Sequence, residues 1–165
     1  MRTRLLPIVV STAFSAEPLR EYMFRTVSQT VVNYRGSSLS QGRAGTVQGG
    51  DRLPWVKTDG SGSDADNFAP LRSLDWQVHV YGEASSGIRA ACEARKISLH
   101  VFPWRPETAQ AGLRRNAVYL VRPDGYVALA DAEGSAAAIE SYLDARNLTL
   151  MRTPAHASVS VRGGK

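Results

Sequence analysis

The clearest pattern of apolar positions lies in the C-terminal third of the chain. Two runs rich in β-branched and aromatic residues, 117–122 and 126–130, flank Pro123-Asp124-Gly125. Proline presets φ at the first central position of a turn, and glycine accepts a positive φ without steric cost. The sequence therefore predicts a tight β-hairpin over residues 117–130.

Several further segments carry a periodic pattern. Residues 76–82 and 97–104 are short runs typical of strands, and residues 85–95 between them favour a helix. A closing helix is predicted over 135–147, and 107–115 is interpreted as a weak helix or a loop. The order strand, helix, strand, hairpin, helix predicts a small layered α/β fold with a central sheet.

Residues 15–34 have the pattern of an amphipathic helix that precedes this α/β region. Ser15 and Pro18 are residue types that favour a helix start. The apolar residues at four-residue spacing are Leu19, Met23, Val27 and Val31. This apolar stripe packs either on the α/β body or on another domain or subunit, so it is a candidate interaction face.

Composition shifts divide the chain into four parts. Residues 1–35 hold the N-terminal segment and its helix, and 36–50, rich in Gly, Ser and Gln, is interpreted as an exposed linker. Residues 51–150 form the predicted α/β domain. Residues 151–165 lack a hydrophobic pattern and are expected to be a disordered basic tail.

Charge and hydropathy narrow the expected partners. No apolar run approaches the roughly 20 residues of a membrane span, so we expect a cytoplasmic protein with no membrane partner. Of the 20 basic residues, five lie in the acid-free ends 1–4 and 151–165, and the remaining 15 balance the 15 acids. Basic ends on a neutral body are not the footprint of a nucleic-acid-binding groove, so no nucleic-acid partner is expected.

A single cysteine, Cys92, limits the chemistry of the chain. It excludes an intramolecular disulfide and the usual cysteine-ligated zinc site. Helical periodicity places Cys92 with Ile88 and Ala91, which favours packing in the core. A reactive thiol remains the alternative interpretation.

The histidines are scattered singly, at positions 79, 100 and 156. His79 and His100 each lie in the middle of a predicted strand, and alternation points each away from its apolar neighbours. They could face each other across adjacent strands. A histidine on a polar face, or one satisfied in the core, is commoner than a metal ligand, so we expect no metal site.

The element order resembles a thioredoxin-like core. Redox members of that fold need Cys-x-x-Cys directly after the first core strand, where the helix N-terminus lowers the pKa of a thiol. Residues 82–87 occupy this place and contain no cysteine, and no proline lies just ahead of the strand that begins at Ala117. The resemblance thus implies a thioredoxin-like sheet that lacks the redox motif.

Four stretches together resemble the C-terminal part of FAD-dependent aromatic-ring monooxygenases. Residues 24–30 and 33–40 look like the last helix of their flavin-containing region and the turn that leaves it. Residues 49–54 look like the start of their C-terminal domain, and 120–128 look like its hairpin. The resemblance covers about residues 17–150.

The resemblance implies a C-terminal domain that serves packing and sometimes subunit contacts. The catalytic apparatus of the family lies in the preceding, FAD-binding region. The glycine cluster Gly42, Gly45, Gly49 and Gly50 follows no predicted strand and lacks the spacing of a dinucleotide-binding loop. We therefore expect no cofactor in this chain, and no catalytic, cofactor-binding or metal residues.

Three functional hypotheses follow. The first is a C-terminal domain that is not catalytic alone and acts in assembly, as a homo-oligomer or on a flavoprotein subunit. The second is a thiol-dependent reductase or peroxidase that uses Cys92. The third is a small aromatic-ligand module built from three tryptophans and the histidines, the tryptophans being Trp55, Trp76 and Trp104.

Overall fold

The computed structural model describes residues 32–58 and 66–149. The chain divides into two units, Met1–Tyr34 and Arg35–Lys165, and every helix and strand given below belongs to the second. Of the N-terminal helix predicted over 15–34, only residues 32–34 are described, and they are not helical. The basic tail and all four residues of the apolar stripe, Leu19, Met23, Val27 and Val31, lie outside the described residues.

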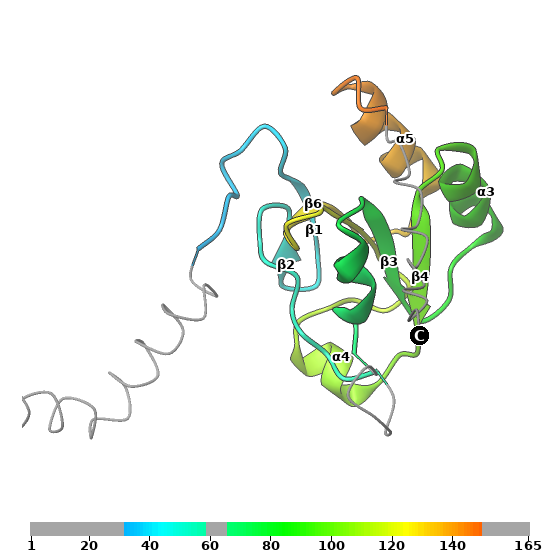
Figure 1. The fold of residues 1–165 in the computed structure, drawn as a ribbon. Coiled ribbons are helices and arrows are strands. Elements are labelled where there is room, and N and C mark those ends of the chain that lie inside the picture. Colours follow the sequence, from blue (N-terminus) through cyan, green and yellow to red (C-terminus); the bar gives the residue numbers. More distant parts are fainter. Residues whose placement is uncertain (1–31, 59–65, 150–165) are drawn as a thin grey trace, which may run out of the picture. The chain divides into compact units, whose positions relative to one another are not determined.

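The described part contains six strands, three α-helices and one 3₁₀ helix (Figure 1). In chain order they are β1 (Gln41–Ala44), β2 (Val47–Gln48), η1 (Ala69–Ser73), β3 (Gln77–Tyr81), α3 (Ser86–Ala94), β4 (Ser98–Phe102), α4 (Pro106–Gln110), β5 (Val118–Val121), β6 (Val127–Asp131) and α5 (Ala136–Asp144). The predicted order strand, helix, strand, hairpin, helix is confirmed in β3, α3, β4, β5–β6 and α5.

All six strands form one mixed sheet in the order β2-β1-β6-β5-β3-β4. The predicted hairpin lies at its centre, with β5 antiparallel to both β6 and β3. Gly125 adopts φ +82° in the turn, and its N–H donates to Arg122 O at 2.9 Å. The residues that predicted the hairpin, Pro123-Asp124-Gly125, therefore form its turn.

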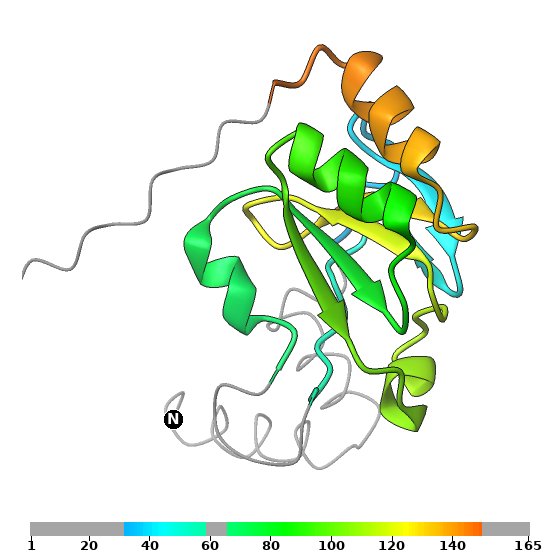
Figure 2. The same ribbon diagram turned by 90° about the vertical axis from the view of Figure 1, so that its right-hand side faces the viewer.

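Side-chain alternation along the central strands divides the core into two layers. Val118 and Leu120 of β5 pack with α3 and α5, whereas Tyr119 and Val121 point to the opposite face. Figures 1 and 2 show α3 and α5 side by side on their face of the sheet. The second face is covered by residues of the 44–56 segment, by η1 and by the end of α4.

The prediction of an exposed linker over 36–50 was wrong for residues 41–48, which form β1 and β2. β1 pairs in parallel with β6, and both Ala44 and Val47 are buried. The glycines that suggested a linker instead allow neighbouring backbone segments to pack closely. A Cβ at Gly49 would lie 2.2 Å from Gln41 N and 2.9 Å from Ala128 O, so only glycine fits there.

Candidate functional site at the first strand of the sheet

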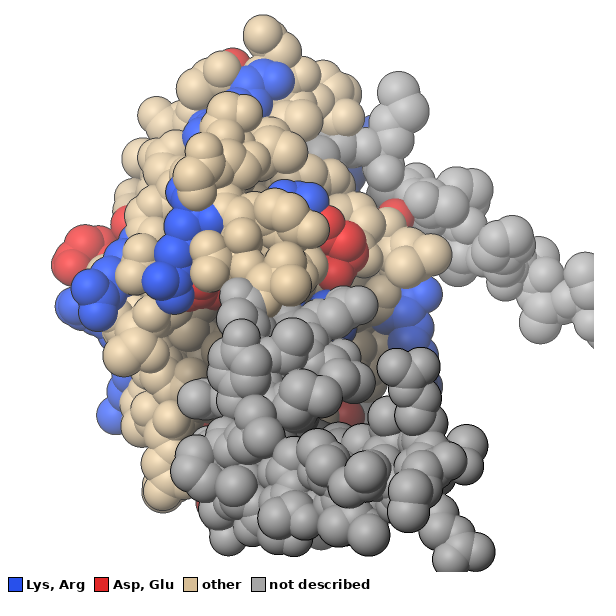
Figure 3. All heavy atoms as spheres, turned by 90° about the vertical axis from the view of Figure 1, so that its left-hand side faces the viewer, with Lys and Arg blue, Asp and Glu red and all other residues tan. Residues whose placement is uncertain are grey.

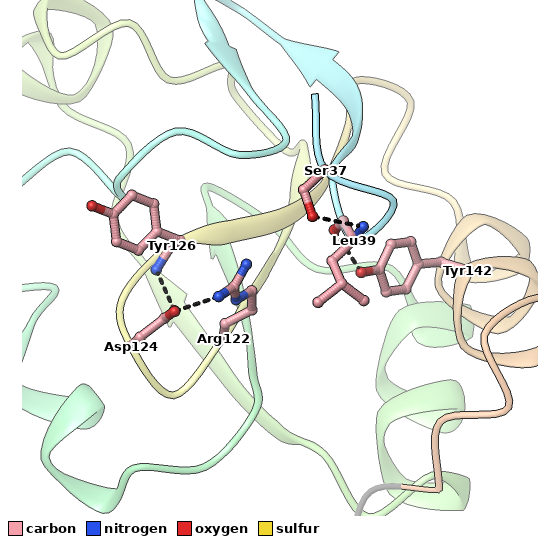
Figure 4. Close-up of polar contacts among 6 residues, drawn as sticks. All are labelled: Ser37, Leu39, Arg122, Asp124, Tyr126 and Tyr142. Carbon is pink, nitrogen blue, oxygen red and sulfur yellow. Dashed lines mark hydrogen bonds and ion pairs between the residues drawn. The ribbon is translucent and has the colours of Figure 1, made fainter. Parts of the chain in front are cut away.

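Residues 35–40, called here the lead-in segment, are fastened to the last helix. Tyr142 of α5 is fully buried, and its hydroxyl donates to Leu39 O at 2.7 Å (Figure 4). Arg146 donates from Nε to Ser38 O at 2.9 Å and stacks over the Tyr142 ring at 3.9 Å. Burial raises the pKa of the Tyr142 phenol, while Arg146 acts in the opposite direction. The phenol therefore stays protonated and able to donate at neutral pH.

A bidentate ion pair between Arg35 and Asp51 holds the start of the lead-in segment in place. Arg35 donates to Asp51 from Nε at 2.6 Å and from Nη2 at 3.1 Å. The same carboxylate accepts the N–H of Gln48 at 2.9 Å, and the carbonyl of Asp51 accepts the N–H of Val127 at 2.8 Å. Asp51 thus links the lead-in segment, the end of β2 and the first residue of β6.

The hairpin turn lies against the residues that follow Asp51. Arg52 forms an isolated bridge with Tyr126, and Leu53 N–H donates to Gly125 O at 3.0 Å. The guanidinium groups of Arg52 and Arg122 lie 5.9 Å and 6.0 Å from the centre of the Tyr126 ring. Asp124 binds Arg122 and accepts the N–H of Tyr126 at 3.2 Å (Figure 4).

These contacts bring four parts of the sequence together: residues 35–40, 49–54, 120–128, and the end of α5 with Tyr142 and Arg146. We call this cluster the junction site. Most of its polar contacts involve backbone carbonyls or amides, so they fix the backbone conformation of these residues. Few side-chain groups are left for acid–base catalysis. The junction site is therefore suited to holding the lead-in segment in one position.

The histidine pair faces the second layer and is held neutral. His79 and His100 are opposite each other on β3 and β4, with ring centroids 5.5 Å apart. His79 is fully buried, its Nε2 lies 3.0 Å from Gln77 Oε1, and its Nδ1 has no hydrogen-bond partner. Burial, together with His100, lowers the pKa of His79 to about 3, and burial also lowers the pKa of His100. We expected a histidine on a polar face or one satisfied in the core; His79 lies in the core, but only one of its two ring nitrogens has a partner.

The described residues contain neither a cluster of metal ligands nor a continuous basic surface on the face shown in Figure 3. No group of three or more His, Cys, Asp or Glu side chains that could hold a metal ion occurs among the described residues. On the face shown in Figure 3, basic side chains are separated by uncharged and acidic surface. Within residues 32–58 and 66–149, no helix is both long and apolar enough to cross a membrane.

Cys92 packs in the core, as its helical position predicted. It is 2% exposed and contacts the layer formed by α3, α5 and the sheet. Burial raises the pKa of the thiol to about 11. A nucleophilic thiolate requires a lowered pKa and solvent access, so the environment of Cys92 favours packing over the thiol-dependent hypothesis.

The three tryptophans do not converge on one place. Trp76 packs against the α3 and α5 layer, and Trp104 packs against the opposite layer. Trp55 is 58% exposed and donates from Nε1 to Asp66 at 3.1 Å. Because the sheet separates Trp76 from Trp104, the arrangement does not favour the aromatic-ligand hypothesis.

The sequence from 46 to 147 matches the family described as "Aromatic-ring hydroxylase, C-terminal". This segment contains β2 to α5 and most of the junction site. The chain belongs to this family. No curated protein matches it.

Three solved structures show that the fold recurs in longer proteins. OxyS, an anhydrotetracycline hydroxylase from Streptomyces rimosus, is 19% identical over 93% of this chain, with a TM-score of 0.54. CabE, an aromatic hydroxylase from angucycline biosynthesis, is 19% identical over 86%, with a TM-score of 0.52. A structure of RebC-10x is 20% identical over 70%, with a TM-score of 0.51. The chain spans 30%, 28% and 23% of these three proteins, respectively.

Two junction contacts of this aromatic-ring hydroxylase C-terminal domain were not predicted from the sequence. The pairing of Arg35 with Asp51 spans 16 residues, and the bond from Tyr142 to Leu39 spans 103. Tyr142 lies on the buried side of α5 with Ile139 and Leu143, and a buried tyrosine needs a partner for its hydroxyl. The sequence could therefore predict that the Tyr142 hydroxyl forms a hydrogen bond, but it could not predict which group accepts it.

Proposed function

We propose that this chain is an assembly module of a flavin-dependent aromatic hydroxylase and is not catalytic by itself. The family match supports this proposal, because the family is the C-terminal part of aromatic-ring hydroxylases. The similarity to OxyS and CabE supports it too, since this chain spans 30% or less of either protein. FAD is then held by a hydroxylase region other than the matched segment.

We further propose that residues 51–150 are a thioredoxin-like domain without its thiol chemistry. The succession β3-α3-β4, β5-β6 and α5, with both helices on one face of the sheet, supports this assignment. In redox members the helix after the first core strand begins with the reactive cysteine. Here Ser85 caps that helix by accepting the N–H of Ile88 at 3.3 Å, and the only thiol is buried further along it.

The junction site is the observation that carries the assembly proposal. The lead-in segment is fastened at its start by the pairing of Arg35 with Asp51 and near its end by Tyr142 and Arg146. A flexible tether needs no such contacts, because its ends are free to move. A segment fastened at both ends instead gives whatever precedes residue 35 a fixed point of attachment to the sheet.

The apolar stripe is the proposed contact with the partner. Leu19, Met23, Val27 and Val31 would form one face of a helix just ahead of the lead-in segment. An apolar helix face packs on another apolar surface, either on a flavoprotein or on a second copy. The junction site would limit the positions from which that helix can reach its partner.

Sedimentation followed by flavin absorbance tests this function. The chain is mixed with an FAD-containing aromatic hydroxylase region from which the C-terminal domain has been removed. We expect the flavin to sediment faster when the chain is present. Asp51→Ala should weaken the complex because the lead-in segment loses its anchor, while Glu140→Ala, an exposed acid on α5, should leave it unchanged. Unchanged flavin sedimentation at all concentrations of the chain contradicts the proposal.

A further inference from the structure

β4 forms one end of the sheet, and its outer edge has no partner among the described strands. It pairs in parallel with β3 over its whole length, from Ser98 opposite Gln77 to Phe102 opposite Tyr81. In Figure 1, β4 lies beside β3 with no labelled strand beyond it. An unpaired edge presents a row of backbone donors and acceptors to other chains.

The direction of these backbone groups follows from one hydrogen bond. Gly82 N–H donates to Phe102 O at 2.8 Å, so the polar backbone groups of Phe102 point toward β3. Alternation then directs those of Leu99 and Val101 to the outer edge. The free row is bounded by Ile97, whose N–H donates to Cys92 O, and by Pro103, which has no N–H.

The side chains of β4 do not protect this edge. The strand reads Ser-Leu-His-Val-Phe and carries no Lys, Asp, Glu or internal proline, which are the residues that natural edge strands use to prevent pairing. Val101 is 39% exposed and is among the few large apolar side chains of the described part that reach solvent to this extent. Among residues 32–58 and 66–149, the edge thus combines unpaired backbone groups with an apolar side chain.

We propose that β4 pairs antiparallel with β4 of a second copy of this chain. Leu99 of each copy would lie opposite Val101 of the other, which forms about four hydrogen bonds from the outward-facing groups. This register is symmetric about His100 and joins the two sheets into one. The inference rests on the proposed assembly function and names one surface for it.

Self-pairing fits the charge of this strand. In this register the two-fold axis brings the same residue of both copies together only at the residue on the axis, and β4 carries no Lys, Arg, Asp or Glu that could meet a like charge. The residue on the axis is His100, and burial lowers its pKa, so both copies are neutral at pH 7. On the other face of the strand, Val101 would be covered by Leu99 of the second copy. β4 of a second copy is an uncharged strand that meets these requirements.

Val101→Pro tests the pairing, because it removes an outward N–H and leaves the bonds to β3 intact. In sedimentation equilibrium of the full chain, we expect a monomer–dimer equilibrium whose dissociation constant rises at least about tenfold in this variant. The control is Val101→Thr, which keeps the N–H and the β-branched shape and should dimerise like the unmodified chain. Circular dichroism checks that each variant folds.

Val101→Lys gives an independent test if the proline variant fails to fold, because a lysine on the edge opposes pairing without altering the backbone. The inference is overturned if the unmodified chain stays monomeric at every concentration, or if the folded proline and lysine variants dimerise like the threonine variant. A chain that binds the flavoprotein region but does not self-associate refutes the β4 pairing and leaves the proposed function intact. A dimer abolished by changes at Leu19 and Met23, but not at Val101, also refutes it.

Discussion

Acid should destabilise this domain through one buried histidine. Gln77 Nε2 lies 2.6 Å from Pro70 O, which can only accept, so the amide nitrogen faces Pro70 and the amide oxygen faces His79. The Nε2 atom of His79 must then carry the proton, and Nδ1 is left as an acceptor without a partner. A proton on Nδ1 would create a buried charge and a buried donor with no acceptor, which the fold disfavours.

The size and sign of the effect follow from the pKa. The folded pKa of His79 is about 3, against 6.5 for an ordinary histidine. The unfolded chain therefore takes up the proton first, and the free energy of unfolding falls as pH drops below about 6.5 until the fall ends near about 3. A difference of this size corresponds to at most about 5 kcal/mol, and to about 3 kcal/mol between about pH 7 and about pH 4.5.

Urea unfolding at several pH values measures this effect. His79→Phe keeps a ring in the core but cannot titrate, so its free energy of unfolding should depend less steeply on pH than that of the unmodified chain. At neutral pH it should cost about 1–3 kcal/mol because Gln77 loses its partner. His100→Gln, at a less buried site, should remove a smaller part of the pH dependence. Parallel pH profiles for the unmodified chain and His79→Phe would refute the reasoning.

Three other substitutions and one matched control probe the junction site and the core. Gly49→Ala should destabilise the fold by about 3 kcal/mol in urea unfolding, because its Cβ would collide with backbone atoms of β1 and β6. The matched change Gly36→Ala, with open space around it, should alter stability by less than about 0.5 kcal/mol. Tyr142→Phe should cost about 1 kcal/mol through the lost bond to Leu39 O, and hydrogen exchange in the lead-in segment should accelerate, whereas unchanged exchange would contradict the anchoring role. Cys92 should resist alkylation until denaturant is added, and Cys92→Ser should leave peroxide and disulfide turnover unchanged, since a fall in turnover would revive the redox hypothesis.

Local signals in the sequence were enough to predict the centre of the fold. Pro123-Asp124-Gly125 supplies its own turn geometry, and the runs on either side are rich in the β-branched and aromatic residues that strands favour. The helix α3 lies within the predicted range 85–95, has Ser85 as its N-cap, and places Cys92 in the core. These features depend on residues that are close together in the chain, so they can be predicted from a single sequence.

The parts that the sequence did not predict depend on distant residues. The segment with Gly42 and Gly49 has the composition of a linker, and it becomes a strand pair only because β6 lies beside it. The pairing of Arg35 with Asp51 and the bond from Tyr142 to Leu39 likewise require the finished sheet. The hypotheses for the histidines and tryptophans also needed the sheet faces, since strand alternation alone does not say which face is covered.

The visible absorption spectrum of the purified chain, taken after incubation with FAD and removal of unbound flavin, tests the central claim most directly. If the chain is an assembly module and not a flavoprotein, the spectrum will show protein absorbance and no bound oxidised flavin. A spectrum with stoichiometric FAD would contradict the claim, because the cofactor would then be held by residues that this account assigns to packing and attachment.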